Sequence, residues 1–320
     1  MRPKAHIWIR PGLPNRAPCA HDRRMTHTEI LQGLSARRKT HLTEPSDRAG
    51  LIHLALYSTA LLISTLAITL KIPLWALLVP VQGILLSFLF TLSHECTHQT
   101  PFRTRWINEA VGHVCAVLIV LPFVWFRYFH LAHHRYTNDP DRDPELEGGH
   151  KPETWPAYLI YLSGFGYWKT GFRTLWTNAF GTPKAPYLSD RLTPRLRREA
   201  RVILAINAVA AISLMFSPLL FWVWILPLLV GQPVLRAYLL AEHGRCPQVA
   251  NMLENSRTTY TTRLVRFLAW NMPYHAEHHS YPSVPFYRLP DLHQDLQAHL
   301  KSTSNGYTEF TADYARHLGH

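Results

Sequence analysis

The chain contains 320 residues, of which 47% are hydrophobic and 12% aromatic, and its formal net charge is +12. Such a basic balance is typical of nucleic-acid-binding proteins or of membrane proteins with a basic cytoplasmic side, and the chain contains no compact basic nucleic-acid motif. The four cysteines are far apart in the sequence: Cys19, Cys96, Cys115 and Cys246. They form no Cys-x-x-Cys pair, which argues against a disulfide framework and against a thiolate metal site. The composition favours a membrane protein of a reducing compartment that does not bind nucleic acid.

The N-terminal segment is polar and basic. Residues 1–24 are rich in proline and lack the apolar region of a signal peptide, and Met25 is an alternative start of translation. Arg37, Arg38 and Lys39 then precede the first long apolar run. We expect residues 1–48 to form a flexible basic tail.

Two apolar runs follow the tail. Leu51–Leu70 and Leu74–Ser93 are separated only by the break Lys71-Ile72-Pro73. Each run approaches the length of about 20 residues that spans the apolar core of a bilayer. So short a break predicts a helical hairpin whose two ends return to the same side of the membrane.

A second pair of apolar runs lies further along the chain. Val202–Phe216 and Leu219–Val230 are separated by a predicted turn at Ser217-Pro218. Buried core helices of a soluble protein are the alternative interpretation, but the lengths and the pairing of the runs favour spans. The sequence predicts an all-α integral membrane protein with two transmembrane helical hairpins, or about four spans, and a cytoplasmic helical cap.

The distribution of basic residues predicts the orientation. Lys and Arg are dense before residue 51, between 103 and 201 and after 235, whereas the two predicted turns carry only Lys71. By the positive-inside rule the termini and the central loop are cytoplasmic. A third apolar run, Val111–Phe126, then cannot cross once, because a single crossing would separate His98 from His130. We expect this run to lie in the interface or to dip in and out of the membrane.

Three histidine clusters stand out among the 20 histidines. Two of them share the spacing i, i+3, i+4, which places the side chains on one helix face. At this histidine content a pair spaced like His94 and His98 arises about once by chance, but two copies of the triple do not. The clusters are His94 and His98; His130, His133 and His134; and His275, His278 and His279.

Clustered histidines indicate metal binding. Neutral imidazole suits zinc, copper, iron and nickel. Because one metal ion takes about four such ligands, eight clustered histidines predict a site for two metal ions.

Two other functions fit part of the pattern. The segment from His94 to His98 matches the His-Glu-x-x-His motif of zinc metalloproteases, with Glu95 as the base. That interpretation leaves both histidine triples unexplained. A metal transporter or store is the second alternative, but transporters usually place their ligands within the spans, and these histidines lie beyond the apolar runs.

The order of the clusters around two apolar hairpins resembles the membrane fatty-acid desaturase superfamily. The resemblance covers about residues 50–295 and includes HECTH from His94, HLAHHRYT from His130 and NMPYHAEHHSYP from Asn271. It implies a desaturase-like membrane domain over 49–295, followed by a cytoplasmic tail over 296–320. The same motifs occur in acyl and sphingolipid desaturases, carotenoid ketolases and hydroxylases, and alkane hydroxylases, so they do not identify the substrate.

The resemblance implies a non-haem centre of two iron ions at the cytoplasmic face. His243, in the segment Ala241-Glu-His-Gly, resembles a ninth ligand found in the family. Asn271 is either a further weak ligand or a helix cap. The carboxylates beside the motifs are candidates to accept hydrogen bonds from the outer imidazole nitrogens, and they are Glu95, Asp139, Asp143, Glu242 and Glu277. An ordinary solvated acidic loop is an equally good interpretation of the segment that begins at Asp139. The implied metal ligands are His94, His98, His130, His133, His134, His243, His275, His278 and His279.

The implied activity is desaturation of a lipid or fatty acyl chain with O2 and externally supplied electrons. A hydroxylase or ketolase acting on a carotenoid, an alkane or a small amino-acid-like molecule is the alternative. The chain contains neither a haem-binding His-Pro-Gly-Gly motif nor Rossmann glycines, so the expected electron donor is a separate ferredoxin- or rubredoxin-type protein with its NAD(P)H reductase. The expected location is a bacterial inner membrane. His293 and His299 fall outside the clusters and are expected to be bystanders.

Overall fold

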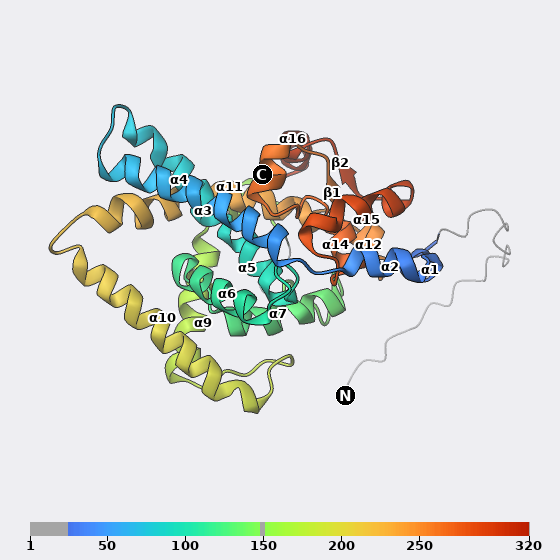
Figure 1. The fold of residues 1–320 in the computed structure, drawn as a ribbon, viewed down its shortest axis with the longest axis horizontal. Helices are drawn as coiled ribbons and strands as arrows, with labels where there is room; N and C mark the ends of the chain where they lie inside the picture. Colours follow the sequence, from blue (N-terminus) through green and yellow to red (C-terminus); the bar gives the residue numbers. More distant parts are fainter. Residues whose placement is uncertain (1–24, 148–150, 320) are drawn as a thin grey trace, which may run out of the picture.

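The structure is a computed structural model that describes residues 25–147 and 151–319. Within these residues the chain is almost entirely helical, with one parallel two-stranded sheet in which Thr258 pairs with Thr303 (Figure 1). The predicted all-α class is confirmed. The expected tail over 1–24 and the question of translation from Met25 concern residues outside the described part.

The elements follow one another with short connections. The first group contains α1 (His27–Gly33), α2 (Ala36–Thr43), α3 (Asp47–Thr69), the 3-10 turn η1 (Trp75–Leu77), α4 (Leu78–Ser87), α5 (Leu89–His98), α6 (Arg105–Ile119) and α7 (Phe123–Tyr136). The second contains α8 (Trp155–Leu162), α9 (Phe165–Phe180), η2 (Asp190–Leu192), α10 (Thr193–Ser213), the π-helical turn η3 (Phe221–Ile225) and α11 (Leu226–His243). The third contains α12 (Met252–Asn255), β1 (Thr258–Thr259), α13 (Arg263–Leu268), α14 (His275–Ser280), η4 (Phe286–Arg288), α15 (Leu289–Leu296), η5 (Gln297–His299), β2 (Thr303–Ser304) and α16 (Tyr307–Arg316).

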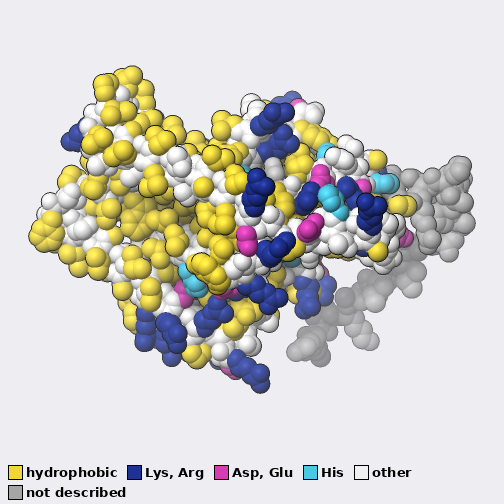
Figure 2. Space-filling model, viewed as in Figure 1, with side chains coloured by type: hydrophobic (Ala, Val, Ile, Leu, Met, Phe, Trp, Pro, Cys, Tyr) yellow, Lys and Arg dark blue, Asp and Glu magenta, His cyan; other side chains and the backbone are white. Residues whose placement is uncertain are grey.

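Long apolar helices make the chain an integral membrane protein. Three described helical segments are long and apolar enough to cross a bilayer: the one ending with α3 at Thr69, Trp75–His98 and Phe221–His243. Leu62 and Ile63 on α3 are 66% and 64% exposed, which suits contact with lipid rather than water. Figure 2 shows the hydrophobic side chains gathered over the region of α3, α4 and the α10–α11 turn, away from most of the charged side chains.

The third apolar run is bent, as the prediction of a dip requires. Helices α6 and α7 meet at 101° across a break at residues 120–122, where Val120 has a φ of 58°. Pro122 then starts α7 with a fixed φ and no N–H. The bend returns the chain toward its starting point, and the Nε2 atoms of His98 and His130 lie 2.8 Å apart.

The first predicted hairpin is present, but the second pair of helices is open (Figure 1). Helix α11 packs along α4, whereas α10 packs mainly on α9. The reason is local. Gly83 and Gly231 face each other with no room for a side chain at either position, which allows α4 and α11 to approach closely. Arg201 of α10 meanwhile donates to the Ala179 carbonyl at the end of α9.

Short helices from both ends of the chain cover the histidine-bearing region. Leu42 of α2 is buried, and Arg38 forms an ion pair of 2.9 Å with Asp295 of α15. At the other end, Phe310 and Tyr314 of α16 are buried in a cluster with Tyr158 of α8. Part of each segment expected as a tail is therefore packed against the membrane domain.

Candidate metal centre

Helix periodicity brings the histidines together. His94 and His98 lie one turn apart at the end of α5, which stops at Gln99 in the left-handed conformation with a φ of 60°. The triple of α7 occupies its last turns, and α14 is little more than the triple His275, His278 and His279. His243 is the last residue of α11. The nine clustered histidines thus lie at or near the ends of four helices, α5, α7, α11 and α14, which converge.

The histidines form two adjacent groups. In group A every member offers a ring nitrogen within 4.8 Å of the others, and its members are His94, His98, His130, His134 and His278. Group B meets the same criterion with His133, His243 and His279. His275 joins group B through its Nε2 atom, which lies 2.9 Å from Nε2 of His243.

The spacing i, i+3, i+4 divides each triple between the two groups. On α7, His130 and His134 face group A while His133 faces group B. On α14 the single residue His278 faces group A, and His279 faces group B. The rings of His134 and His279 stack with centroids 4.0 Å apart, so the two groups share a wall.

Several ring nitrogens of these groups have no hydrogen-bond partner among the described residues. Seven of the nine histidines are buried with exposures of at most 5%, whereas His98 and His134 are partly exposed. Both ring nitrogens of His94, His134 and His278 have no hydrogen-bond partner among the described residues. A buried polar atom without a partner costs about 1–3 kcal/mol. A bound cation would remove this cost.

One contact in group B has a geometry that suits a bound cation. The Nδ1 atom of His243 lies 3.1 Å from the Asn255 carbonyl, and Nδ1 of His133 lies 2.9 Å from Asp143 Oδ1. Both oxygens accept, so both Nδ1 atoms carry the proton in the neutral ring. In two neutral rings the Nε2 atoms would present lone pairs to each other at 3.2 Å, and either a proton or a metal ion between them removes that repulsion.

The protonation state also suits a metal. Burial lowers the pKa of His275, His278 and His279 well below the ordinary value, and the neighbouring imidazoles lower it further. These rings are therefore neutral at pH 7, the form that coordinates metal ions. The residues present fit metal ions of the kind that imidazole binds.

Three of the five carboxylates named from the sequence lie against histidines of the two groups. Asp143 holds His133, and Glu242 Oε1 lies 3.5 Å from Nδ1 of His275. Glu95 is fully buried between His94 and His278, with its Oε1 atom at 3.5 Å and 3.6 Å from their Nδ1 atoms.

The other two carboxylates have different partners. Asp139 pairs with Arg142 at 2.6 Å in an exposed loop, as the solvated interpretation of this loop predicts. Glu277 accepts a hydrogen bond of 2.6 Å from Thr258 and contacts His293. His293 thus contacts the buried carboxylate of α14, a partner that the sequence did not indicate, and its expected role as a bystander to the reaction stays a prediction.

Asn271 does not cap α14. Its side-chain amide donates to the Phe286 carbonyl at 3.0 Å, and its φ is 58°. The N-cap of α14 is Tyr274, which makes no side-chain capping bond. The capping prediction is wrong because the chain turns at Asn271 before the helix begins.

Some supporting groups escape sequence reasoning. Thr137 Oγ1 lies 3.0 Å from Nδ1 of His279 and donates to the His133 carbonyl at 2.8 Å, which ties α7 to α14. Its position three residues after His134 could have marked Thr137 as a supporting residue from the sequence alone. The Asn255 carbonyl at the end of α12 has no such signal, because a backbone acceptor does not depend on residue type.

An opening connects group A to the surface. A cavity of about 600 Å³ has His98 in its wall, and Thr97, Gln99, Arg127, Leu131 and Ser283 also line it. The centre is buried but reachable.

Comparison with known proteins agrees with this geometry. The sequence model of the fatty acid desaturase family matches residues 72–311. An sn-1 oleoyl-lipid 12-desaturase of Picosynechococcus sp. is 40% identical over 72 residues, 22% of this chain and 21% of that protein. A sphingolipid delta(4)-desaturase of Drosophila melanogaster is 28% identical over 219 residues, 66% of this chain and 62% of that protein. The dihydrorhizobitoxine desaturase of Bradyrhizobium elkanii is 27% identical over 269 residues, 77% and 74% of the two chains. The chain thus covers less than two thirds of the first two relatives.

Proposed function

The chain belongs to the fatty acid desaturase family, and from this membership we propose that it is a membrane oxidoreductase that uses O2 to desaturate a lipid or fatty acyl chain. One observation carries the proposal. Two adjacent groups of mostly buried imidazoles lie in contact with each other, and several of their ring nitrogens have no hydrogen-bond partner among the described residues. Such a pair of groups suits two metal ions held side by side.

We assign the nine histidines as iron ligands by group. Group A would hold one iron ion through His94, His98, His130, His134 and His278, and group B would hold the other through His133, His243, His275 and His279. Two iron ions bound there supply the reduction of O2 and the removal of hydrogen from an unactivated C–H bond.

The protein supplies orientation and exclusion of water. Asp143, the Asn255 carbonyl and Thr137 fix the outer nitrogens of three imidazoles, which directs their Nε2 atoms inward. The burial of most of these rings keeps bulk water away from the reacting carbon.

The zinc protease is a poor fit to the same geometry. His94 and His98 share their group with three further histidines from α7 and α14. Glu95 lies between two imidazoles and is fully buried, which leaves it no access to a water that attacks a peptide.

A second substrate class remains a candidate because of one comparison. The relative named dihydrorhizobitoxine desaturase matches 77% of this chain. The alternative proposal is a desaturase of a small molecule rather than of an acyl lipid. In either case a separate ferredoxin- or rubredoxin-type protein with its reductase would supply the electrons.

We further propose that the centre faces the cytoplasm. The support is the positive-inside rule applied to the basic segments that flank the histidines. Single cysteines at Ile72 and Phe216, which are 42% and 84% exposed, should react with a membrane-impermeant thiol reagent added outside cells. A cysteine at Arg316 should react only after lysis, and the reverse pattern would refute the orientation.

Expression in a bacterial host tests the function. Fatty acid profiles by gas chromatography with mass spectrometry should gain an unsaturated species, and purified protein should contain about two iron ions per chain. In His278→Ala the unsaturated species should be lost and the iron content should fall, whereas both should be kept in His299→Ala. One zinc ion per chain, unaffected by the iron supply, would overturn the proposal. An unchanged lipid profile with full iron loading would favour the small-molecule substrate.

A further inference from the structure

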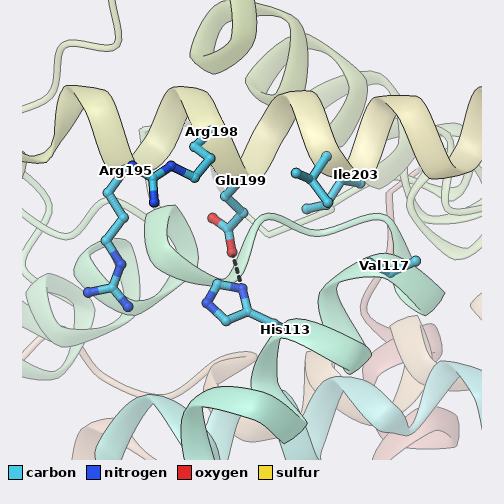
Figure 3. A pocket seen from close by; sticks show the side chains of 7 residues that line it. His113, Val117, Arg195, Arg198, Glu199 and Ile203 are labelled. Atoms are coloured by element: carbon cyan, nitrogen blue, oxygen red, sulfur yellow. Dashed lines mark ion pairs between the residues drawn. The ribbon is translucent and has the colours of Figure 1, made fainter.

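A second cavity lies between α6 and α10, away from the histidine groups. Its volume is about 290 Å³, and its walls carry both charged and apolar side chains. Figure 3 shows Arg195, Arg198, Glu199 and Ile203 on α10 facing His113 and Val117 on α6. Nothing in the proposed metal centre uses these residues.

The two helices run side by side, so the cavity has a charged end and an apolar end. Arg195 forms an ion pair of 2.8 Å with Glu109. One helical turn further along, a carboxylate oxygen of Glu199 lies 2.9 Å from Nδ1 of His113. A further turn along, Val117 and Ile203 line the cavity from the same two helices. Polarity therefore falls steadily along the length of the cavity.

The charged end carries uncompensated positive charge. Glu109 is shared by Arg195 and Arg127, and both oxygens of the buried Glu199 accept from the backbone N–H of Val124 at 2.9 Å and 3.1 Å. Arg198 is exposed and has no ion pair among the described residues. The guanidinium group of Arg198 is thus available to an external anion.

The apolar end continues onto a face of α10 that no other described element covers. Val202, Ile206, Val209 and Ile212 are 50%, 42%, 67% and 57% exposed, and their spacing puts them on one side of the helix. In an integral membrane protein such a stripe faces acyl chains. The charged end of the cavity then lies toward the headgroups, where long basic side chains are favoured.

We propose that this cavity binds one anionic phospholipid. The phosphate is held by Arg198 and by the Arg195 guanidinium, a donor geometry that matches phosphate oxygens. One acyl chain lies along Val117, Val202 and Ile203. Glu199 also accepts from the N–H of Val124 in the first turn of α7, so the cavity adjoins the helix that carries three of the clustered histidines. This site goes beyond the proposed reaction and is independent of it.

Lipid binding to the purified protein in neutral detergent tests the proposal, with native mass spectrometry as the readout. Phosphatidylglycerol should bind more tightly than phosphatidylcholine, and inorganic phosphate should not displace it. Arg198→Ala should weaken phosphatidylglycerol binding about fivefold, which corresponds to about 1 kcal/mol for one basic residue at an anionic lipid. The matched control is Arg191→Ala, an exposed basic residue outside the cavity.

A second pair of variants tests the apolar end. Val202→Trp fills the cavity without a change of charge and should also weaken binding, whereas Val209→Trp on the same helix face should not. Equal binding of phosphatidylcholine would overturn the anionic headgroup. Displacement by inorganic phosphate, together with unchanged binding in Val202→Trp, would show a simple anion site. Equal losses in Arg191→Ala and Arg198→Ala would show diffuse charge rather than a site.

Discussion

Replacement of Asp143 by asparagine is a sharp test of how the protein prepares its metal centre. Asp143 is 2% exposed, and its Oδ1 and Oδ2 atoms lie 2.9 Å and 3.1 Å from Nδ1 of His133. The same carboxylate accepts from the backbone N–H groups of Asn138 at 2.7 Å and Glu145 at 3.0 Å. Asparagine keeps one acceptor oxygen and the size of the side chain but removes the charge that would make His133 a stronger ligand.

The expected loss follows from the role of an outer carboxylate. Removal of such a partner typically weakens metal binding about 10- to 100-fold, or about 1.4–2.8 kcal/mol. Iron should therefore leave Asp143→Asn at chelator concentrations that the parent protein resists, and group B should empty first. Competition with a chromogenic chelator measures the affinity, and circular dichroism of the iron-free protein checks the fold.

The same loop provides the control. Asp139→Asn removes an identical charge four residues away, but Asp139 is paired with Arg142 and not with a histidine. It should retain parental iron affinity. If both variants lose iron equally, the effect is one of loop charge, and the assignment of Asp143 to His133 is wrong.

Sequence periodicity predicts the histidine groups because a helix converts spacing into direction. Residues at i and i+4 share a face, so His130 and His134 had to point the same way once α7 formed. Spacing alone does not show that His133 and His278 serve opposite groups. That division depends on the crossing of α7 and α14, which is a property of packing between distant segments.

The membrane helices show the same limit. Apolar length predicts α3, α4 and α11, and the charge argument predicts that the run containing α6 bends back. The open second pair was not predictable from hydropathy. It depends on Gly83 meeting Gly231 across two helices that lie far apart in the sequence, and on polar bonds that hold α10 to α9.

The remaining predictions concern one ligand, one helix contact and one supporting histidine. His243→Ala should lower the iron content from about two ions toward one, measured by elemental analysis against His299→Ala, and an unchanged content would exclude a ninth ligand. Gly231→Leu should lower the melting temperature strongly, because the new side chain overlaps the Gly83 backbone and overpacking costs about 1–3 kcal/mol or more; Gly166→Leu, with open space around it, is the control. His293→Ala should be less stable than the parent although it removes no metal ligand. The variant leaves one oxygen of the fully buried Glu277 without its partner, and a buried polar atom without a partner costs about 1–3 kcal/mol. The melting temperature and the iron retention should both fall in His293→Ala. In protein that already carries Glu277→Gln, the same change at His293 should have little further effect. A melting curve for His293→Ala that matches His299→Ala would show that the contact with Glu277 contributes nothing to the centre.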